Sequence, residues 1–195
     1  FLSADHGGMN NAKFLQDRRI PAGNWENKVA KNYLDEALKA KYPSAGSLIK
    51  GVFNYQVFFD TSKIDSLGLD YSQVKQVVVN RLKKDKDVHY AFDMEKTAIE
   101  SIPEDVKTRA INGYNRERSG GVQVILKPAY YDHGWKGTSH GVWNGYDTHI
   151  PLVFMGWGIK QGASTKPCYM TDIAATVCAL LHIQAPDGCI GEPIF

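Results

Sequence analysis

The sequence predicts an α/β fold with a mostly parallel central sheet covered by helices. Residues 1–4, 121–126 and 150–155 form nearly continuous apolar runs, a pattern typical of strands buried on both faces of a sheet. Segments between them repeat apolar residues at helical spacing. The chain has 195 residues, of which 43% are hydrophobic, so it is large enough to bury a substantial core.

The first half of the chain alternates helices and strands. Residues 9–26 are polar and rich in Asn, which predicts a loop. Residues 27–42 carry apolar side chains at helical spacing up to Pro43, so we expect a helix there. Residues 51–59 are β-branched and aromatic, which predicts one strand.

Helix-capping residues mark the next elements. Asp70 can cap a helix that runs to about Lys84, and residues 88–92 form a short strand. Pro103 at a first-turn position predicts a helix to about Tyr114. A further helix is expected from residue 171 or 172 to residue 181.

The stretch from about residue 52 to residue 115 therefore contains strand, helix, strand and helix in turn. We expect it to form a compact α/β subdomain inserted between strands of the main sheet and packed on its edge.

Composition excludes several classes of function. The formal net charge of +2 gives no sign of the strongly basic surface that nucleic-acid binding requires. No apolar run reaches the roughly 18 residues needed to span a bilayer. Cys168, Cys178 and Cys189 have no metal-binding spacing. We expect Cys178 to be buried in a helix, and a disulfide between Cys168 and Cys189 stays an open alternative.

An Asp–His pair stands almost at the start of the chain. Asp5 and His6 follow an apolar strand and can offer a zinc ion one oxygen and one imidazole nitrogen. Gly7 and Gly8 let the backbone turn away from such a site. The alternative is an ordinary turn at a strand end. A strand that delivers ligands at once is an unusual start for a domain, so we interpret the chain as the later part of a larger enzyme.

A second histidine, His140, lies between small residues in Gly137–Gly141, where a metal can approach it closely. The alternative is a surface turn. Asp5, His6 and the loop of residues 130–146 all follow carboxyl ends of predicted strands, where ligands of open α/β sheets gather. We therefore expect Asp5, His6 and His140 to converge within reach of a metal.

Several motifs together resemble the C-terminal part of the alkaline phosphatase superfamily. They are Asp5-His6-Gly7-Gly8, Gly137–Gly141, Ile150–Gly158, Tyr169–Thr176 and Glu192-Pro193-Ile194. The nearest branch is that of bacterial alkaline phosphatases and type I phosphodiesterase/nucleotide pyrophosphatase-like proteins. The resemblance covers residues 1–195 in pieces and is least specific from residue 52 to residue 115.

The resemblance implies a zinc-dependent phosphoric ester hydrolase with two zinc ions. Asp5 and His6 match the ligands of the zinc that holds the nucleophile's oxygen, and His140 matches a ligand of the other zinc. The Ser or Thr nucleophile and the other ligands are expected upstream of Phe1, so this chain alone should be inactive. The resemblance also implies a small-molecule phosphoester substrate, the N-terminal part of the same protein as partner, and a periplasmic or secreted location.

Other residues have weaker assignments. His149 can orient a metal ligand through a hydrogen bond from its ring N–H, or serve as a structural histidine. Trp143, Asn144 and Tyr146 can line a substrate pocket or pack within the loop. Asp132-His133-Gly134 is a second Asp-His-Gly triplet without the second glycine. His89 and His182 are expected to be ordinary fold residues.

Two groups of alternatives remain open. A sulfatase, a phosphonate hydrolase or a phosphoglycerate mutase of the same superfamily would share the Asp–His pair and the later histidine. A non-catalytic binding module is an alternative of a different class.

Overall fold

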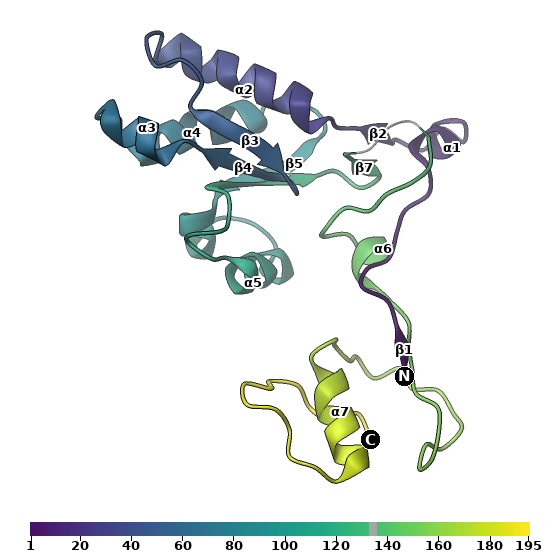
Figure 1. The fold of residues 1–195 in the computed structure, drawn as a ribbon. Coiled ribbons are helices and arrows are strands. Elements are labelled where there is room, and N and C mark those ends of the chain that lie inside the picture. The colour runs from purple at the N-terminus through teal and green to yellow at the C-terminus, as the bar shows by residue number, and fades with distance from the viewer. Residues whose placement is uncertain (133–135) are drawn as a thin grey trace. The chain divides into compact units, whose positions relative to one another are not determined.

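The computed structural model describes residues 1–132 and 136–195 (Figure 1). The described chain divides into two units, one of residues 4–150 and a smaller one of residues 1–3 with residues 151–195. The larger unit contains a four-stranded sheet with helices. The α/β class predicted from the sequence is thus confirmed.

The sheet of the larger unit is antiparallel, with the strand order β3-β4-β6-β5. Its strands are β3 (Ile49–Phe53), β4 (Gln56–Phe59), β5 (Val88–Asp93) and β6 (Val122–Leu126). The predicted parallel direction is wrong for this sheet. All five residues of β6 are buried. A strand that is buried on both faces has a continuous apolar run whether its neighbours are parallel or antiparallel, so the run does not reveal the strand direction.

Helices cover both faces of this sheet. Figure 1 shows α2 (Asn27–Lys41) and α4 (Tyr71–Leu82) on one side and α5 (Glu104–Gly113) on the other. Neighbouring residues of β6 point to opposite sides, because Val124 belongs to the core under α2 and α4 while Ile125 packs with residues of α5. This two-sided cover matches the predicted arrangement of helices around a sheet.

The long helices begin and end close to the predicted residues. Helix α2 ends before Pro43 and buries Ala30, Leu34 and Leu38 along one stripe. Asp70 caps α4, since its side chain accepts hydrogen bonds from the Ser72 and Gln73 N–H groups at 2.8 and 3.2 Å. Capping and helical spacing were therefore reliable signals in this chain.

The predicted strand of residues 51–59 is instead a hairpin. Asn54 and Tyr55, with φ of 48° and 59°, form the turn between β3 and β4. Two consecutive residues in the left-handed region are typical of the tight turns whose twist matches a hairpin. The apolar run hides this turn because Tyr55 is itself buried.

Short elements complete the larger unit, and some lie in the predicted loop of residues 9–26. They are α1 (Ala12–Gln16), β2 (Gly23–Asn24), α3 (Thr61–Ser66), the 3-10 helix η1 (Met94–Ile99), β7 (Tyr130–Tyr131) and α6 (Gly145–Thr148). Strands β2 and β7 pair in parallel. The described residues thus contain both parallel and antiparallel pairs.

The smaller unit contains β1 (Leu2–Ser3), β8 (Leu152–Val153) and α7 (Asp172–Leu181). Strands β1 and β8 pair with each other, antiparallel. The prediction of buried strands at residues 1–4 and 150–155 is wrong for this chain, because the paired strands span two residues each and Phe1 is 69% and Met155 91% exposed. The run of residues 121–126 lies in the sheet of the larger unit, so the three apolar runs do not form one sheet.

Strand β6 also joins the strands of residues 52–115 in one sheet, so these strands are not separate from the run of residues 121–126. Whether residues 52–115 are an insertion in a longer protein stays a prediction. Among the described residues, no helix combines the length and the apolar character that a membrane crossing requires.

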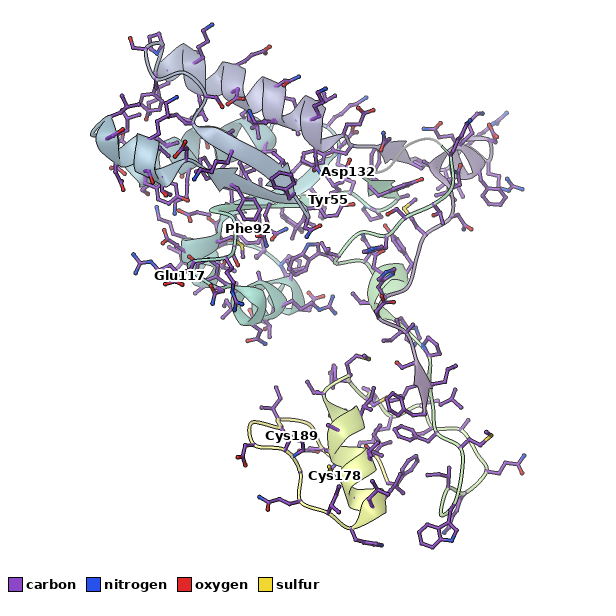
Figure 2. The ribbon with its side chains drawn as sticks, viewed as in Figure 1. Tyr55, Phe92, Glu117, Asp132, Cys178 and Cys189 are labelled. Carbon is purple, nitrogen blue, oxygen red and sulfur yellow. The ribbon has the colours of Figure 1, made fainter. Side chains whose placement is uncertain are left out.

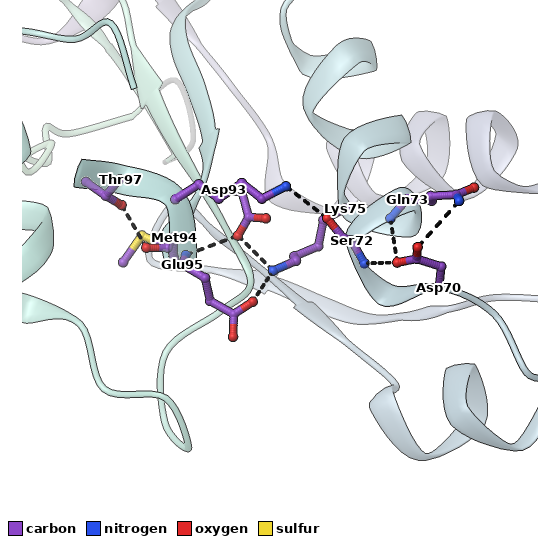
Figure 3. A network of polar contacts seen from close by, with 9 residues as sticks. Asp70, Ser72, Gln73, Lys75, Asp93, Met94, Glu95 and Thr97 are labelled. Atoms are coloured by element: carbon purple, nitrogen blue, oxygen red, sulfur yellow. Dashed lines mark hydrogen bonds and ion pairs between the residues drawn. The ribbon is translucent and has the colours of Figure 1, made fainter. Parts of the chain in front are cut away.

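A buried lysine joins α4 to the end of β5 (Figure 3). Lys75 is 1% exposed, and its ammonium group lies 2.8 Å from a carboxylate oxygen of Asp93 and also binds Glu95. The same ammonium lies 4.5 Å from the centre of the Tyr71 ring. Two carboxylates and one ring therefore compensate the desolvation of this charge.

Candidate metal centre

Two loops far apart in the sequence lie side by side within the larger unit. The Gly7 N–H donates to the Asp147 carbonyl at 2.7 Å, and the Met9 N–H donates to the Ser139 carbonyl at 3.3 Å. The Thr138 hydroxyl donates to the Met9 carbonyl. These hydrogen bonds fix residues 7–9 against residues 138–147.

This pairing brings His6 and His140 together, as the sequence predicted. The two imidazole rings stack, with 3.7 Å between their centres and 21° between their planes. Asp5 lies beside them, since its Oδ2 atom is 3.6 Å from His6 Nε2. His6 and His140 therefore lie in contact although 134 residues separate them, while the convergence of all three residues within reach of a metal stays a prediction.

Both imidazoles contact the main chain through the same nitrogen. His6 Nδ1 lies 2.7 Å from the Gly7 carbonyl, and His140 Nδ1 lies 2.8 Å from the Gly141 carbonyl. A carbonyl only accepts hydrogen bonds, so Nδ1 carries the hydrogen in each neutral ring and Nε2 keeps a free lone pair. A metal-binding histidine is commonly fixed in this way.

The donors fit zinc in chemistry and in spacing. Oxygen and imidazole donors at about 2.0–2.2 Å from a tetrahedral zinc lie about 3.3–3.5 Å from each other, and the Asp5–His6 pair lies at 3.6 Å. In the described part of the chain, no group of three or more His, Cys, Asp or Glu side chains is arranged to hold one metal ion. The resemblance assigns two of these ligands to one zinc and the third to another, and this assignment stays a prediction.

Comparison with known proteins gives the family. The chain is 46% identical over 195 residues to alkaline phosphatase PafA of Elizabethkingia meningoseptica, and 42% identical over 194 residues to alkaline phosphatase PhoV of Synechococcus elongatus. A crystal structure of wild-type PafA matches 99% of the chain with a TM-score of 0.92 and 45% identity. The chain belongs to the alkaline phosphatase superfamily.

The chain spans only about a third of these relatives, namely 35% of the first protein, 34% of the second and 36% of the solved chain. A third relative, from Myroides odoratus, is named a calcium-transporting ATPase and is 42% identical over 196 residues, with 36% of its length covered. No family model matches the chain. The predicted membership in the alkaline phosphatase superfamily is confirmed by the first two relatives and the crystal structure.

Tyr55, in the turn between β3 and β4, supports the loop that carries His140 in this chain. Its hydroxyl donates to the His140 carbonyl at 3.3 Å and accepts from the Asp132 N–H at 3.0 Å. Burial raises the pKa of Tyr55, which keeps the phenol neutral and able to donate. The sequence pattern contains no sign of this role, because it predicts Tyr55 within a strand.

The three residues expected at a substrate pocket have other contacts here. Trp143 packs against the core that contains Phe92 and Ile125, while Asn144 caps α6. The Tyr146 hydroxyl accepts from the Ala129 N–H at 2.8 Å, and burial raises the pKa of that phenol. The cavity beside Trp143 and Asn144 measures about 10 Å³, which is room for about one water molecule. A substrate-binding role for these residues stays a prediction.

The structure gives the remaining candidates other surroundings. His149 ends α6, and its side chain is exposed. The Asp132 carboxylate accepts from the Asn27 N–H and side-chain amide at the start of α2, and Figure 2 shows Asp132 next to Tyr55. His133 and Gly134 of the second Asp-His-Gly triplet lie outside the described residues.

The cysteines of the smaller unit are free thiols. Cys178 is buried on α7, as predicted, while Cys168 is exposed and Cys189 is partly buried. Figure 2 marks Cys178 on the helix and Cys189 on the segment that follows it. The structure therefore contains no bridge between Cys168 and Cys189.

Proposed function

We propose that the protein containing this chain is a zinc-dependent hydrolase of small-molecule phosphoesters, in which Asp5, His6 and His140 are metal ligands. The observation that carries the proposal is the stacked His6–His140 pair, in which each Nδ1 atom is bonded to a main-chain carbonyl, in a member of the alkaline phosphatase superfamily.

Each ligand has a distinct task in this proposal. Asp5 and His6 hold one zinc, and His140 holds a second zinc. Zinc held there would supply positive charge that offsets the negative charge on the attacking and leaving oxygens. The Gly7 and Gly141 carbonyls orient the imidazoles so that Nε2 faces the metal. We infer that the nucleophile and the other ligands come from a part of the protein outside this chain.

Phosphorus is favoured over sulfur as the atom attacked. Two relatives are named alkaline phosphatases and one is named an ATPase, and all three names describe the cleavage of a bond between phosphorus and oxygen. Phosphate monoesters and diesters, including nucleotide pyrophosphates, are therefore the substrates to test first. We place the protein in the periplasm or outside the cell, in line with the resemblance.

The decisive experiment uses the longer protein that contains this chain. We expect hydrolysis of phosphate monoesters or diesters that is lost with a chelator and restored by zinc. The His140→Ala variant should lower kcat/KM by orders of magnitude, because one zinc loses a ligand. His89→Ala is the matched control, since His89 is an exposed histidine on β5.

Three results would contradict the proposal. They are full activity of the His140→Ala variant, hydrolysis of sulfate esters in preference to phosphate esters, and zinc binding without any turnover. The last result would identify a binding module.

A further inference from the structure

Asp147 contacts both of the loops that carry the histidines. This residue of α6 is only 3% exposed. Its main-chain carbonyl accepts the Gly7 N–H at 2.7 Å, and its carboxylate Oδ1 accepts the Gly141 N–H at 2.8 Å. Gly7 directly follows His6, and Gly141 directly follows His140.

The same two glycines bind the imidazoles through their other polar group. The Gly7 carbonyl accepts from His6 Nδ1, and the Gly141 carbonyl accepts from His140 Nδ1. Each glycine therefore connects Asp147, through its N–H, to one histidine ring, through its carbonyl. Asp147 is the residue at which the two connections meet.

The carboxylate of Asp147 has little freedom to move. Its Oδ2 atom accepts the Asn144 N–H at 3.3 Å, and the Asn144 side chain completes the reciprocal cap of α6. A Cβ atom on Gly141 would lie 2.8 Å from the same Oδ2 atom. The carboxylate and the backbone at Gly141 are therefore packed against each other.

We propose that Asp147 is a positioning residue, which holds His6 and His140 in the geometry that binds metal. The proposal rests on the function proposed above. Without the carboxylate, the Gly141 N–H loses its acceptor and the His140 loop is free to shift, while the link from Gly7 to the main chain of residue 147 persists. Partners that orient metal ligands typically change metal affinity by about 10- to 100-fold.

The test measures zinc affinity in the longer protein by competition with a chelator. We expect Asp147→Ala to raise the zinc dissociation constant by about 10- to 100-fold. Asp147→Asn keeps an oxygen for the Gly141 N–H and should recover most of the affinity. Thr148→Ala is the control, because Thr148 is exposed on the same helix and its hydroxyl donates to the Asn144 carbonyl rather than to either histidine loop. It should leave the affinity unchanged.

A second measurement covers the case in which Asp147→Ala does not fold. Nitrogen NMR of the metal-free protein should show the Nδ1–H tautomer for His140 in the wild type and in Asp147→Asn, and a more mixed tautomer population in Asp147→Ser, whose shorter side chain lacks the carboxylate that accepts from the Gly141 N–H. A merely structural cap would lower the thermal midpoint without changing either the zinc affinity or the tautomer. Unchanged zinc affinity and an unchanged His140 tautomer in folded Asp147→Ala or Asp147→Ser would overturn the proposal.

The His140→Ala variant separates this failure from failure of the proposed function. If His140→Ala binds zinc and turns over substrate like the wild type, the metal role of the site is wrong. If His140→Ala loses both and the Asp147 variants lose neither, only the positioning role is wrong.

Discussion

Gly7 and Gly8 are neighbours with different structural requirements. A Cβ atom on Gly7 would collide with the Tyr146 carbonyl, whereas the nearest atom to a Cβ on Gly8 is the Ser139 carbonyl oxygen at 3.8 Å. The sequence suggested that both glycines serve a turn. The structure gives Gly7 a different reason, since the backbone of residues 146–147 approaches it too closely for any side chain.

This difference predicts unequal effects of the same substitution. Gly7→Ala should lower the free energy of unfolding by about 1–3 kcal/mol, because the backbone must shift to relieve the collision. Gly8→Ala should change it by less than about 0.5 kcal/mol. Urea unfolding of the 195-residue chain measures both, and equal losses would show that the close approach at Gly7 has no energetic consequence.

The candidate ligands could be found from the sequence, but the residues that support them could not. Asp5, His6 and His140 stand in recognisable surroundings, with strand ends and small neighbours. Asp147 gives only the weak signal of a polar residue three positions after Asn144, as in a helix cap. Its link to Gly7 runs through a main-chain carbonyl, and no side-chain pattern encodes such a contact.

At the scale of elements, apolar spacing located helices and strands but not their pairing. Helices α2, α4, α5 and α7 lie close to the predicted residues, because amphipathic spacing and capping are local properties. The direction of β6 depends on partners some 30 to 70 residues away. The Asn54–Tyr55 turn was missed because its tyrosine is buried like the strand residues around it.

The contact between α4 and the segment after β5 predicts a dependence of stability on pH. The hydrogen bond from Lys75 lowers the pKa of Glu95 below its ordinary value of 4.5. A lowered folded-state pKa adds stability above the unfolded-state pKa, and that stability is lost as the pH falls through the folded-state value.

We therefore expect Glu95→Gln to destabilise the chain at pH 7 and to differ less from the wild type below about pH 4. The free energy of unfolding of both proteins, measured by urea from pH 7 to pH 3, gives this difference directly. Glu117→Gln, at an exposed glutamate marked in Figure 2, is the control and should show no such convergence. A constant difference between Glu95→Gln and the wild type would contradict the ion pair.

At the scale of the whole molecule, the chain carries fewer candidate ligands than two zinc sites need. A protein zinc site has about four donors, of which a catalytic site takes three from the protein. The described residues bring together Asp5, His6 and His140. The chain spans about a third of the length of its relatives. We have proposed that the remaining donors come from a part of the protein outside this chain.

The 195-residue chain by itself is therefore expected to bind zinc weakly and to show no phosphatase turnover. Titration calorimetry with zinc and an assay on phosphate monoesters and diesters test this directly. The longer protein, assayed in parallel, is the positive control. Robust hydrolysis by the purified chain would mean that a nucleophile and a sufficient ligand set lie within these residues.

The pairing of the His6 and His140 loops also sets an order of events during synthesis on the ribosome. His6 is made 134 residues before His140, which at about 5–20 residues per second corresponds to roughly 7–27 s. The sheet of residues 49–126 is complete in sequence before His140 exists, and sheets of this size can form within that time. The nascent chain thus carries Asp5 and His6 without their partner loop until translation has passed Asp147.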